Sequence, residues 1–184
     1  MVHWGEGMRR RAVIGLGANL PSRVGGPEQT VRAAMEELSG AGRVAARSSL
    51  YRTEPVEVEE QPAFVNAVAE IDTELEPDAL LDFLLALERS YGRDRQRETP
   101  KGPRTLDLDL LLVDDEVIAT ANLRVPHPAL AERRFVLEPL AEIAPELRHP
   151  VLGKTMAELL AELPDEGANR RDAVKKLRGP TTLP

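Results

Sequence analysis

The sequence predicts an α+β fold with a βαββαβ core, in which helices cover one face of a four-stranded antiparallel sheet. Apolar runs of strand length alternate with amphipathic segments of helix length in the order strand, helix, strand, strand, helix, strand. A single antiparallel sheet is the most economical packing for that order. The 184 residues, 42% of them hydrophobic, suit one domain with a substantial core. Residues 1–184 are expected to form that domain, with a flexible extension at 1–8 and a loosely attached tail at 165–184.

The first half of the core is expected to hold a buried strand, a helix and two further strands. The spacing of apolar residues places these elements, in order, at residues 12–17, 28–38, 44–51 and 64–71. A turn at residues 19–22 follows the first strand, and Gly40 ends the helix. A loop rich in proline and glutamate, residues 53–62, separates the two later strands.

The second half is expected to add a long helix, the last core strand and a C-terminal extension. Pro77 opens the helix, and leucines recur at helical spacing until Gly92 ends it. A loop at residues 93–103 leads into the strand that begins at Asp107. Beyond it the sequence predicts a hairpin around residues 114–116, an extended segment at 123–126, and helices at 129–143 and 154–162. The result is a ferredoxin-like core that leaves the open face of the sheet for function.

Composition argues against several classes of function. The formal charge of −7, from 31 acidic and 24 basic side chains, opposes a surface dedicated to nucleic acid, although a local basic patch still suits a small anionic ligand. The absence of cysteine removes disulfides, a thiolate nucleophile and cysteine-bound zinc, and it fits a reducing compartment. No apolar run approaches the roughly 18 residues of a membrane span. We therefore expect a soluble, cytoplasmic protein, most simply a monomer, without a nucleic-acid or membrane partner.

Two carboxylates lie two residues apart at the start of the last core strand. Alternation along a strand places Asp107 and Asp109 on one face. Their charges repel, and a hard cation such as Mg²⁺ relieves the repulsion, with substrate phosphates as further ligands. Removing either carboxylate is expected to relieve it as well. The alternative is a strand with a merely solvated polar face, but the continuous apolar run after Asp109 and the basic residues of the preceding segment favour the metal site: Arg93, Arg95, Arg97, Lys101 and Arg104.

Several motifs together resemble one enzyme family. Residues 102–109 read GPRTLDLD, with YRTEP at 51–55 before them and VPH at 125–127 and RRF at 133–135 after them. These motifs, with GLGANL at 15–20 and QPAFVNA at 61–67, resemble 6-hydroxymethyl-7,8-dihydropterin pyrophosphokinase of folate synthesis and keep the order of that family. The resemblance runs from about Ala12 to the helix after Gly153. By contrast, Gly15-x-Gly17 alone is a weak nucleotide-loop signal, because the full glycine fingerprint is missing.

The resemblance implies an activity and its cofactors. The family transfers pyrophosphate from the co-substrate ATP to the hydroxymethyl oxygen of the pterin, giving the pterin diphosphate and AMP in tetrahydrofolate biosynthesis. Attack falls on the β-phosphorus, and such transfers depend mainly on positioning and charge stabilisation. Two Mg²⁺ ions are expected on Asp107 and Asp109, and no protein nucleophile is required.

The resemblance also assigns roles residue by residue. The residues implied for catalysis are Arg93, Arg95, Arg104, Asp107 and Asp109. Those implied for ATP binding are Glu88, Arg93, Arg104, His127 and Arg133. Those implied for pterin binding, by ring stacking and by hydrogen bonds to the pterin edge, are Thr53, Pro55, Val56, Phe64, Asn66 and Phe135. Arg93 and Arg95 match a mobile catalytic loop that is expected to order when both substrates are bound.

Simpler interpretations stand beside some of these roles. Glu88 is otherwise a surface charge of the long helix, Phe64 and Phe135 are otherwise core residues, and His127 otherwise satisfies a loop carbonyl. The loop differs from the family pattern as well. Many relatives carry an aromatic residue directly before the GPR motif, whereas this chain has Lys101 in a loop one residue longer.

Two other functions remain open from the sequence alone. A non-catalytic βαββαβ module that binds RNA on its sheet would stack bases on strand aromatics, but here the strands carry few aromatic residues and two carboxylates. A nucleotidyltransferase would use the same carboxylates to transfer a nucleotide and release pyrophosphate. Product analysis with ATP and the pterin distinguishes all three functions.

Overall fold

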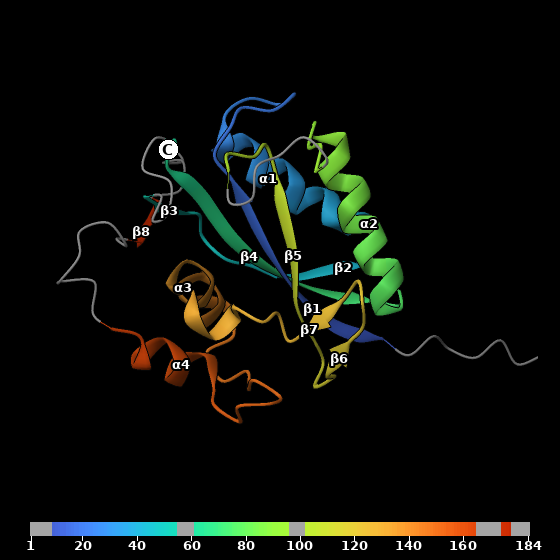
Figure 1. Ribbon diagram of the computed structural model, residues 1–184, viewed down its shortest axis with the longest axis vertical. Coiled ribbons are helices and arrows are strands. Elements are labelled where there is room, and N and C mark those ends of the chain that lie inside the picture. The colour runs from blue at the N-terminus through green and yellow to red at the C-terminus, as the bar shows by residue number, and fades with distance from the viewer. Residues whose placement is uncertain (1–8, 55–60, 96–101, 165–173, 178–184) are drawn as a thin grey trace, which may run out of the picture.

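Within residues 9–54, 61–95, 102–164 and 174–177, which the computed structural model describes, a six-stranded sheet separates two groups of helices (Figure 1). The strands lie in the order β5-β1-β4-β3-β8, and β2 also pairs with β4. Every pairing in this sheet is antiparallel. Because β1 pairs with β4 on one side and β5 on the other, these three strands form one continuous surface.

The elements follow the predicted order, with several short elements added. Along the chain they are β1 (Arg10–Ala18), α1 (Pro27–Glu37), the 3-10 helix η1 (Leu38–Gly40), β2 (Arg43–Arg47), β3 (Tyr51–Thr53), β4 (Phe64–Thr73), α2 (Pro77–Ser90), β5 (Asp107–Val113), β6 (Ile118–Ala119), β7 (Arg124–Val125), the 3-10 helix η2 (Leu130–Glu132), α3 (Arg134–Ile143), α4 (Met156–Glu162) and β8 (Val174–Lys176).

The helices begin where the sequence supplies a start signal. Proline opens both α1 and α2, where its missing N–H costs no helical hydrogen bond. α4 begins with a capping box, in which the Thr155 hydroxyl accepts from the Glu158 N–H at 3.1 Å and the Glu158 carboxylate accepts from the Thr155 N–H at 2.7 Å. Local sequence therefore determines where these helices start.

Helices pack on both faces of the sheet, so the face that was expected to be open is covered in part. On one face, Ile14 and Leu16 of β1 pack in a core with Leu84 of α2 and the apolar side of α1. On the other face, Val13 of β1 packs in a second core with Leu137 of α3 and the apolar side of α4. Because side chains alternate between the two faces along β1, this strand contributes residues to both cores. The C-terminal helices α3 and α4 pack on the face that a bare βαββαβ core would expose (Figure 1).

Three element boundaries differ from the predictions. The strand predicted at 44–51 is divided, because the Ser48 hydroxyl takes a ladder position by accepting from the Val68 N–H at 2.9 Å. The chain turns at residues 114–116, but the paired hairpin strands there are β6 and β7. The helix predicted at 129–143 is interrupted at Arg133, whose extended backbone separates η2 from α3.

The C-terminal region adds a strand that the sequence did not predict. Val174 and Lys176 of β8 lie opposite Thr53 and Tyr51 of β3, and so extend the sheet at that edge. β8 has only three residues, which is too short for a strand pattern to be recognised in the sequence. It forms a strand because the edge of β3 is available for pairing. In the part of the chain that the structure describes, no helix has the length and apolar character needed to cross a bilayer.

Candidate active site

A glycine strip in β1 forms the floor of the candidate site. Gly17 lies opposite Asp107 of β5 on one side and Asn66 of β4 on the other, and Gly15 lies opposite Asp109. A Cβ atom at Gly17 would lie 3.0 Å from the Asn66 Oδ1 atom. The two glycines therefore belong to a strand, and the absence of side chains keeps the space between the carboxylates and Asn66 open.

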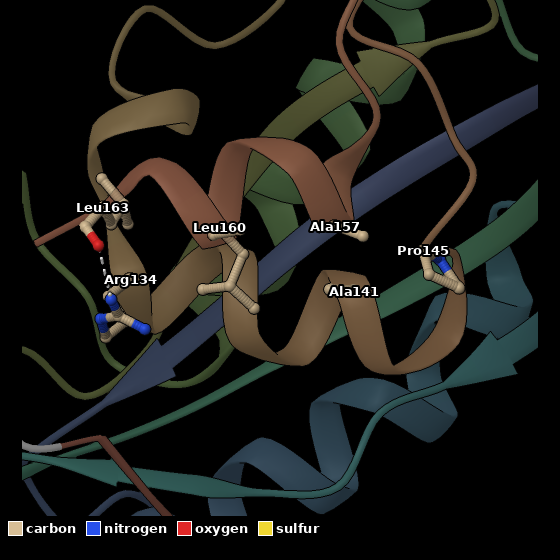
Figure 2. Close-up of a pocket in the computed structure, with 7 residues that line it drawn as sticks. Arg134, Ala141, Pro145, Ala157, Leu160 and Leu163 are labelled. Carbon is tan, nitrogen blue, oxygen red and sulfur yellow. Dashed lines mark hydrogen bonds between the residues drawn. The ribbon is translucent and has the colours of Figure 1, made fainter. Parts of the chain in front are cut away.

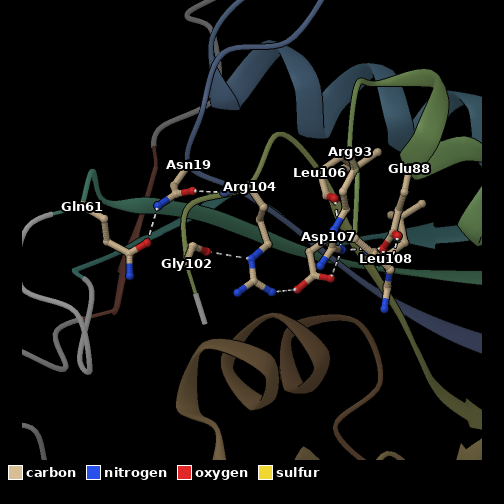
Figure 3. Close-up of polar contacts among 10 residues, drawn as sticks. Asn19, Gln61, Glu88, Arg93, Gly102, Arg104, Leu106, Asp107 and Leu108 are labelled. Atoms are coloured by element: carbon tan, nitrogen blue, oxygen red, sulfur yellow. Dashed lines mark hydrogen bonds and ion pairs between the residues drawn. The ribbon is translucent and has the colours of Figure 1, made fainter. Parts of the chain in front are cut away.

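Glu88 is the centre of a buried charge network on the edge of this floor (Figure 3). Its side chain is 1% exposed. It accepts from the Arg93 Nη1 atom at 2.7 Å, from the Arg95 Nε and Nη2 atoms at 2.9 Å each, and from the Leu108 N–H at 2.8 Å. The interpretation of Glu88 as a helical surface charge is therefore wrong: long-range partners bury it, and the helical pattern of α2 alone does not indicate them.

Arg93 connects this network to the first aspartate. Its Nη1 atom donates to Glu88, to the Leu106 carbonyl at 3.2 Å and to the Asp107 Oδ1 atom, and its side chain is 6% exposed. The Arg93 guanidinium is thus held between α2 and β5. The Arg95 guanidinium is about half exposed and reaches outward from Glu88.

Asp107 and Asp109 have opposite electrostatic environments. Burial alone would raise the pKa of Asp107, but Arg93, Arg104 and Arg95 outweigh it and hold that pKa below its usual value. The Arg104 Nη1 atom donates to Asp107 Oδ2 at 2.8 Å. Burial, then the charge of Asp107, raise the pKa of Asp109 to about 6 although Arg133 opposes them. Removing either carboxylate relieves the mutual repulsion, but removing Asp107 also leaves Arg93 and Arg104 without their partner, so a net gain in stability is expected only for removal of Asp109.

Asn19 joins three loops beside the network and was missed as a site residue. Its Oδ1 atom accepts from the Arg104 N–H at 2.8 Å, and its Nδ2 atom donates to the Gln61 Oε1 atom at 3.1 Å and to the Pro62 carbonyl at 3.0 Å. The Arg104 carbonyl in turn accepts from the backbone of Asn19 at 3.1 Å. Figure 3 shows this chain of contacts running from Gln61 to Asp107. The GLGANL motif was the available signal, because it ends one residue after this amide.

A groove of about 470 Å³ opens beside Asp109. Arg95, Asp109, Arg124 and His127 supply its charged and titratable groups. The other lining residues come from α2, β5 and the region of the β6–β7 hairpin: Leu81, Leu85, Leu108, Leu110, Thr120, Ala121, Asn122, Leu123 and Pro128. Most of these are apolar or small residues that no sequence pattern singles out before the fold brings them together.

His127 is neutral and fixed in one tautomer. Burial, and then the charge of Arg133, lower its pKa, although Asp107 opposes the shift. Its Nδ1 atom accepts from the Ala129 N–H at 3.2 Å, so the proton of the neutral ring lies on Nε2. One ring nitrogen thus holds the loop through a backbone N–H and not through the carbonyl that the simpler interpretation assumes, and the other is a donor on a residue that lines the groove.

Three of the residues implied for the pterin, Thr53, Phe64 and Asn66, lie on β3 and β4, across the glycine strip from the two aspartates. Asn66 is buried, and its Nδ2 atom donates to the Thr53 hydroxyl. Phe64 begins β4, and the Arg104 guanidinium carbon lies 5.9 Å from its ring centre. Phe135 lies in the first turn of α3, with the Arg133 guanidinium 5.6 Å from its ring centre. Pro55 and Val56 lie outside the described residues.

A second pocket, of about 320 Å³, lies between α3 and α4 and contains none of these residues (Figure 2). Its walls are mainly the apolar side chains of Ala141, Leu160 and Leu163. Arg134 closes one end by donating to Glu138 at 3.2 Å and to the Leu163 carbonyl at 3.2 Å. These contacts give Arg134 a structural role at this pocket.

The donor set fits a magnesium site completed by substrate. Among the described residues, no group of three or more histidine, aspartate or glutamate side chains could hold a metal ion by itself. Asp107 and Asp109 offer a pair of carboxylates, and within the same ranges Asp109 has no hydrogen-bond or ion-pair partner. Mg²⁺ is characteristically bound by one or two carboxylates together with water and substrate phosphates.

Comparisons with known proteins point to one family. A model of the 7,8-dihydro-6-hydroxymethylpterin-pyrophosphokinase (HPPK) family matches residues 13–145. A 2-amino-4-hydroxy-6-hydroxymethyldihydropteridine pyrophosphokinase of Pseudomonas aeruginosa is 43% identical over 165 residues, which cover 89% of this chain and 98% of that protein. The enzyme of the same name from Bacillus subtilis is 44% identical over 140 residues, covering 76% and 81%.

A solved structure shares the fold. Wild-type HPPK-DHPS of Plasmodium falciparum matches with a TM-score of 0.66 at 15% identity, over 86% of this chain and 45% of that chain. This chain therefore spans less than half of that protein, and at this identity the likeness shows the fold alone.

The opposite environments of the two aspartates predict opposite effects on stability. Because the folded-state pKa of Asp109 lies above the unfolded value of about 3.9, its contribution to the free energy of unfolding falls as pH rises from about 4 to about 6. Asp109→Asn should therefore stabilise the metal-free protein at pH 7, by on the order of 1–3 kcal/mol, and lose this advantage below pH 4. Urea unfolding at both pH values measures it.

Asp107→Asn serves as the matched variant. Its folded-state pKa is lowered, so its stabilising contribution is present at neutral pH and lost as pH falls. This variant should be less stable than the parent protein at pH 7. Equal effects of the two substitutions at pH 7 would contradict the assigned asymmetry.

Proposed function

The chain belongs to the 7,8-dihydro-6-hydroxymethylpterin-pyrophosphokinase family, and from that premise we propose how its residues divide the work of the reaction. The chain is an ATP-dependent enzyme of folate biosynthesis that transfers pyrophosphate to the hydroxymethyl group of 6-hydroxymethyl-7,8-dihydropterin and leaves AMP. One observation carries the proposed site. Asp107 and Asp109 lie opposite Gly17 and Gly15, with a groove beside Asp109 and the buried amide of Asn66 on the other side of Gly17.

Asp107 and Asp109 would hold two Mg²⁺ ions together with the phosphates of ATP. Bound there, Mg²⁺ would neutralise the triphosphate and make the hydroxyl proton of the pterin easier to lose. Asp109, free of ion pairs in the described part of the chain, has both oxygens available. Asp107 is the better positioned of the two, because Arg93 and Arg104 fix each of its oxygens.

The arginines stabilise the charge that develops on the phosphates. Arg95 and Arg104 point their remaining N–H groups toward the polyphosphate, and Arg93 exchanges its contact with Asp107 for one with the phosphates when the substrate binds. Glu88 contributes to ATP binding through these arginines, since its carboxylate aims both Arg93 and Arg95. Because these guanidinium groups are already held in place, less conformational entropy is lost when they bind the charge that develops on the phosphates.

The groove beside Asp109 receives the nucleoside part of ATP. Its apolar walls suit a flat base, while His127 and Arg133 donate to the polyphosphate near the opening. The neutral His127 supplies a donor at Nε2 without adding charge. Arg133 reaches the same region, as its electrostatic effect on both Asp109 and His127 indicates.

The pterin occupies the other side of the glycine strip. Phe64 and Phe135 stack on its two faces, and Asn66 reads its amide edge with Thr53. The backbone near Pro55 and Val56 completes that edge. Since Thr53 already holds the Asn66 amide, the amide is oriented before the ligand arrives.

We further propose that the chain works as a single-domain monomer in the cytoplasm: its 184 residues suit one domain, and its lack of cysteine fits a reducing compartment.

The reaction class is tested by its products. With Mg²⁺, ATP and the pterin, phosphorus NMR should show AMP and the pterin diphosphate in equal amounts. ADP formation would contradict a pyrophosphate transfer, release of free pyrophosphate would favour a nucleotidyltransferase, and no turnover would favour a binding module.

The assignment of the pterin side is tested by separating the two ligands. Asn66→Ala and Phe135→Ala should each weaken pterin binding by about tenfold or more while ATP binding changes little, because an edge hydrogen bond and a stacked ring contact only the pterin. Calorimetry with an ATP analogue whose α,β-bridging oxygen is replaced by methylene measures both affinities. Equal losses for the two ligands, with a lower melting temperature, would indicate core packing instead.

A further inference from the structure

Glu142 connects three elements on the helix-covered face of the sheet. It lies near the end of α3, and its Oε2 atom accepts from the Tyr51 hydroxyl at 2.6 Å. It also accepts from the Ser49 hydroxyl at 2.8 Å, from the Ser49 N–H at 3.2 Å and from the Lys176 Nζ atom at 3.2 Å. One carboxylate thus joins α3 to β3, to the residues before β3 and to β8.

The β3 end of this connection lies directly beside the proposed pterin edge. Tyr51 is opposite Asn66 across the β3–β4 ladder, and Thr53 is opposite Phe64. Side chains of directly paired residues share one face of a sheet. Tyr51, which bonds to Glu142, therefore shares that face with Asn66, whose amide is held by Thr53 of the same strand.

On the α3 side, Glu142 shares its helix with Phe135, the ring proposed to stack on the pterin. Phe135 precedes Glu142 by seven residues, about two helical turns, so the two side chains lie on the same side of α3. The helix therefore presents Phe135 at its start and Glu142 near its end. Tyr51 makes the contact that fixes this side of the helix over β3.

The protonation states of Tyr51 and Glu142 favour the hydrogen bond between them. Burial would raise the pKa of Glu142, but hydrogen bonds from Tyr51, Ser49 and Lys176 hold it below its usual value, so the carboxylate is charged at neutral pH. Burial, and then the bond to Glu142, raise the pKa of the Tyr51 hydroxyl well above its usual value, so it remains a donor. A charged acceptor makes the stronger kind of hydrogen bond.

We propose that Glu142 is a positioning residue for the pterin: through Tyr51 it sets the separation between the helix that carries Phe135 and the strands that carry Asn66 and Phe64. This inference rests on the proposed pterin site. Glu142 touches neither substrate, so its effect is on the width of the pterin slot and not on the chemistry. The ATP groove draws its lining from α2, β5 and the β6–β7 region, and none of it from α3 or β3.

Two conservative variants test the proposal. Tyr51→Phe removes one hydroxyl from a buried ring, and Glu142→Gln keeps the shape but not the charge. Each should raise the Kd of the pterin, measured by calorimetry with Mg²⁺ and the methylene ATP analogue present, by roughly three- to tenfold. The Kd of the analogue itself should stay within about twofold. The double variant should lose little more than the weaker-binding single variant, because both changes break the same contact.

Glu162→Gln is the matched control. It removes an exposed carboxylate that pairs with Lys154 at 2.7 Å on α4, away from the pterin residues, and should change neither affinity. Pterin affinities unchanged in the Tyr51 and Glu142 variants, or equal losses for pterin and analogue, would overturn the positioning role while leaving the proposed function in place. If the parent protein itself failed to bind the pterin, the proposed pterin site and this inference would both fall. If Glu142→Gln did not fold, the result for Tyr51→Phe decides.

Discussion

Burial of one carboxylate, Glu88, is the constraint on which the site depends. An ionised side chain that is 1% exposed is tolerable only with full compensation. Two guanidinium groups and the N–H of Leu108 supply it, and they come from the loop after α2 and from β5. The requirement to neutralise Glu88 therefore aims Arg93 and Arg95 and fixes the start of β5, where the two aspartates begin.

This network contacts Asp107 but not Asp109 among the described residues. Arg93 extends the network to Asp107, and Arg104 holds the other oxygen of that carboxylate, so Asp107 is fixed and its charge is balanced. Asp109 receives no such contact within the described residues and stays poorly solvated, which raises its pKa. An oriented carboxylate beside an unsatisfied one suits a site completed by a cation and the oxygens of a substrate. The glycine strip of β1 leaves room for both substrates beside this pair.

Local patterns were sufficient for the core elements and insufficient for what the chain brings together from a distance. β1, α1, α2 and β5 were predicted because periodicity, opening prolines and an apolar run are local signals. The covering of the second face by α3 and α4 depends on which side those helices pack, and β8 depends on a free sheet edge. Local patterns alone did not mark Glu88 or Asn19, because their partners lie up to 20 and 85 residues away, and only the family resemblance singled out Glu88. The family motifs supplied the remaining site residues, which periodicity alone would assign to the core.

The most direct measurement of the central claim is the single-turnover rate of Glu88→Gln with both substrates saturating. Glutamine keeps the shape of the side chain and an acceptor for the Leu108 N–H, but it removes the charge that holds Arg93 and Arg95. The account predicts a folded protein, judged by its circular dichroism, whose rate falls by at least about tenfold, as for the loss of a group that positions charge stabilisation. A rate within twofold of the parent protein would contradict the claim that this buried carboxylate organises the site.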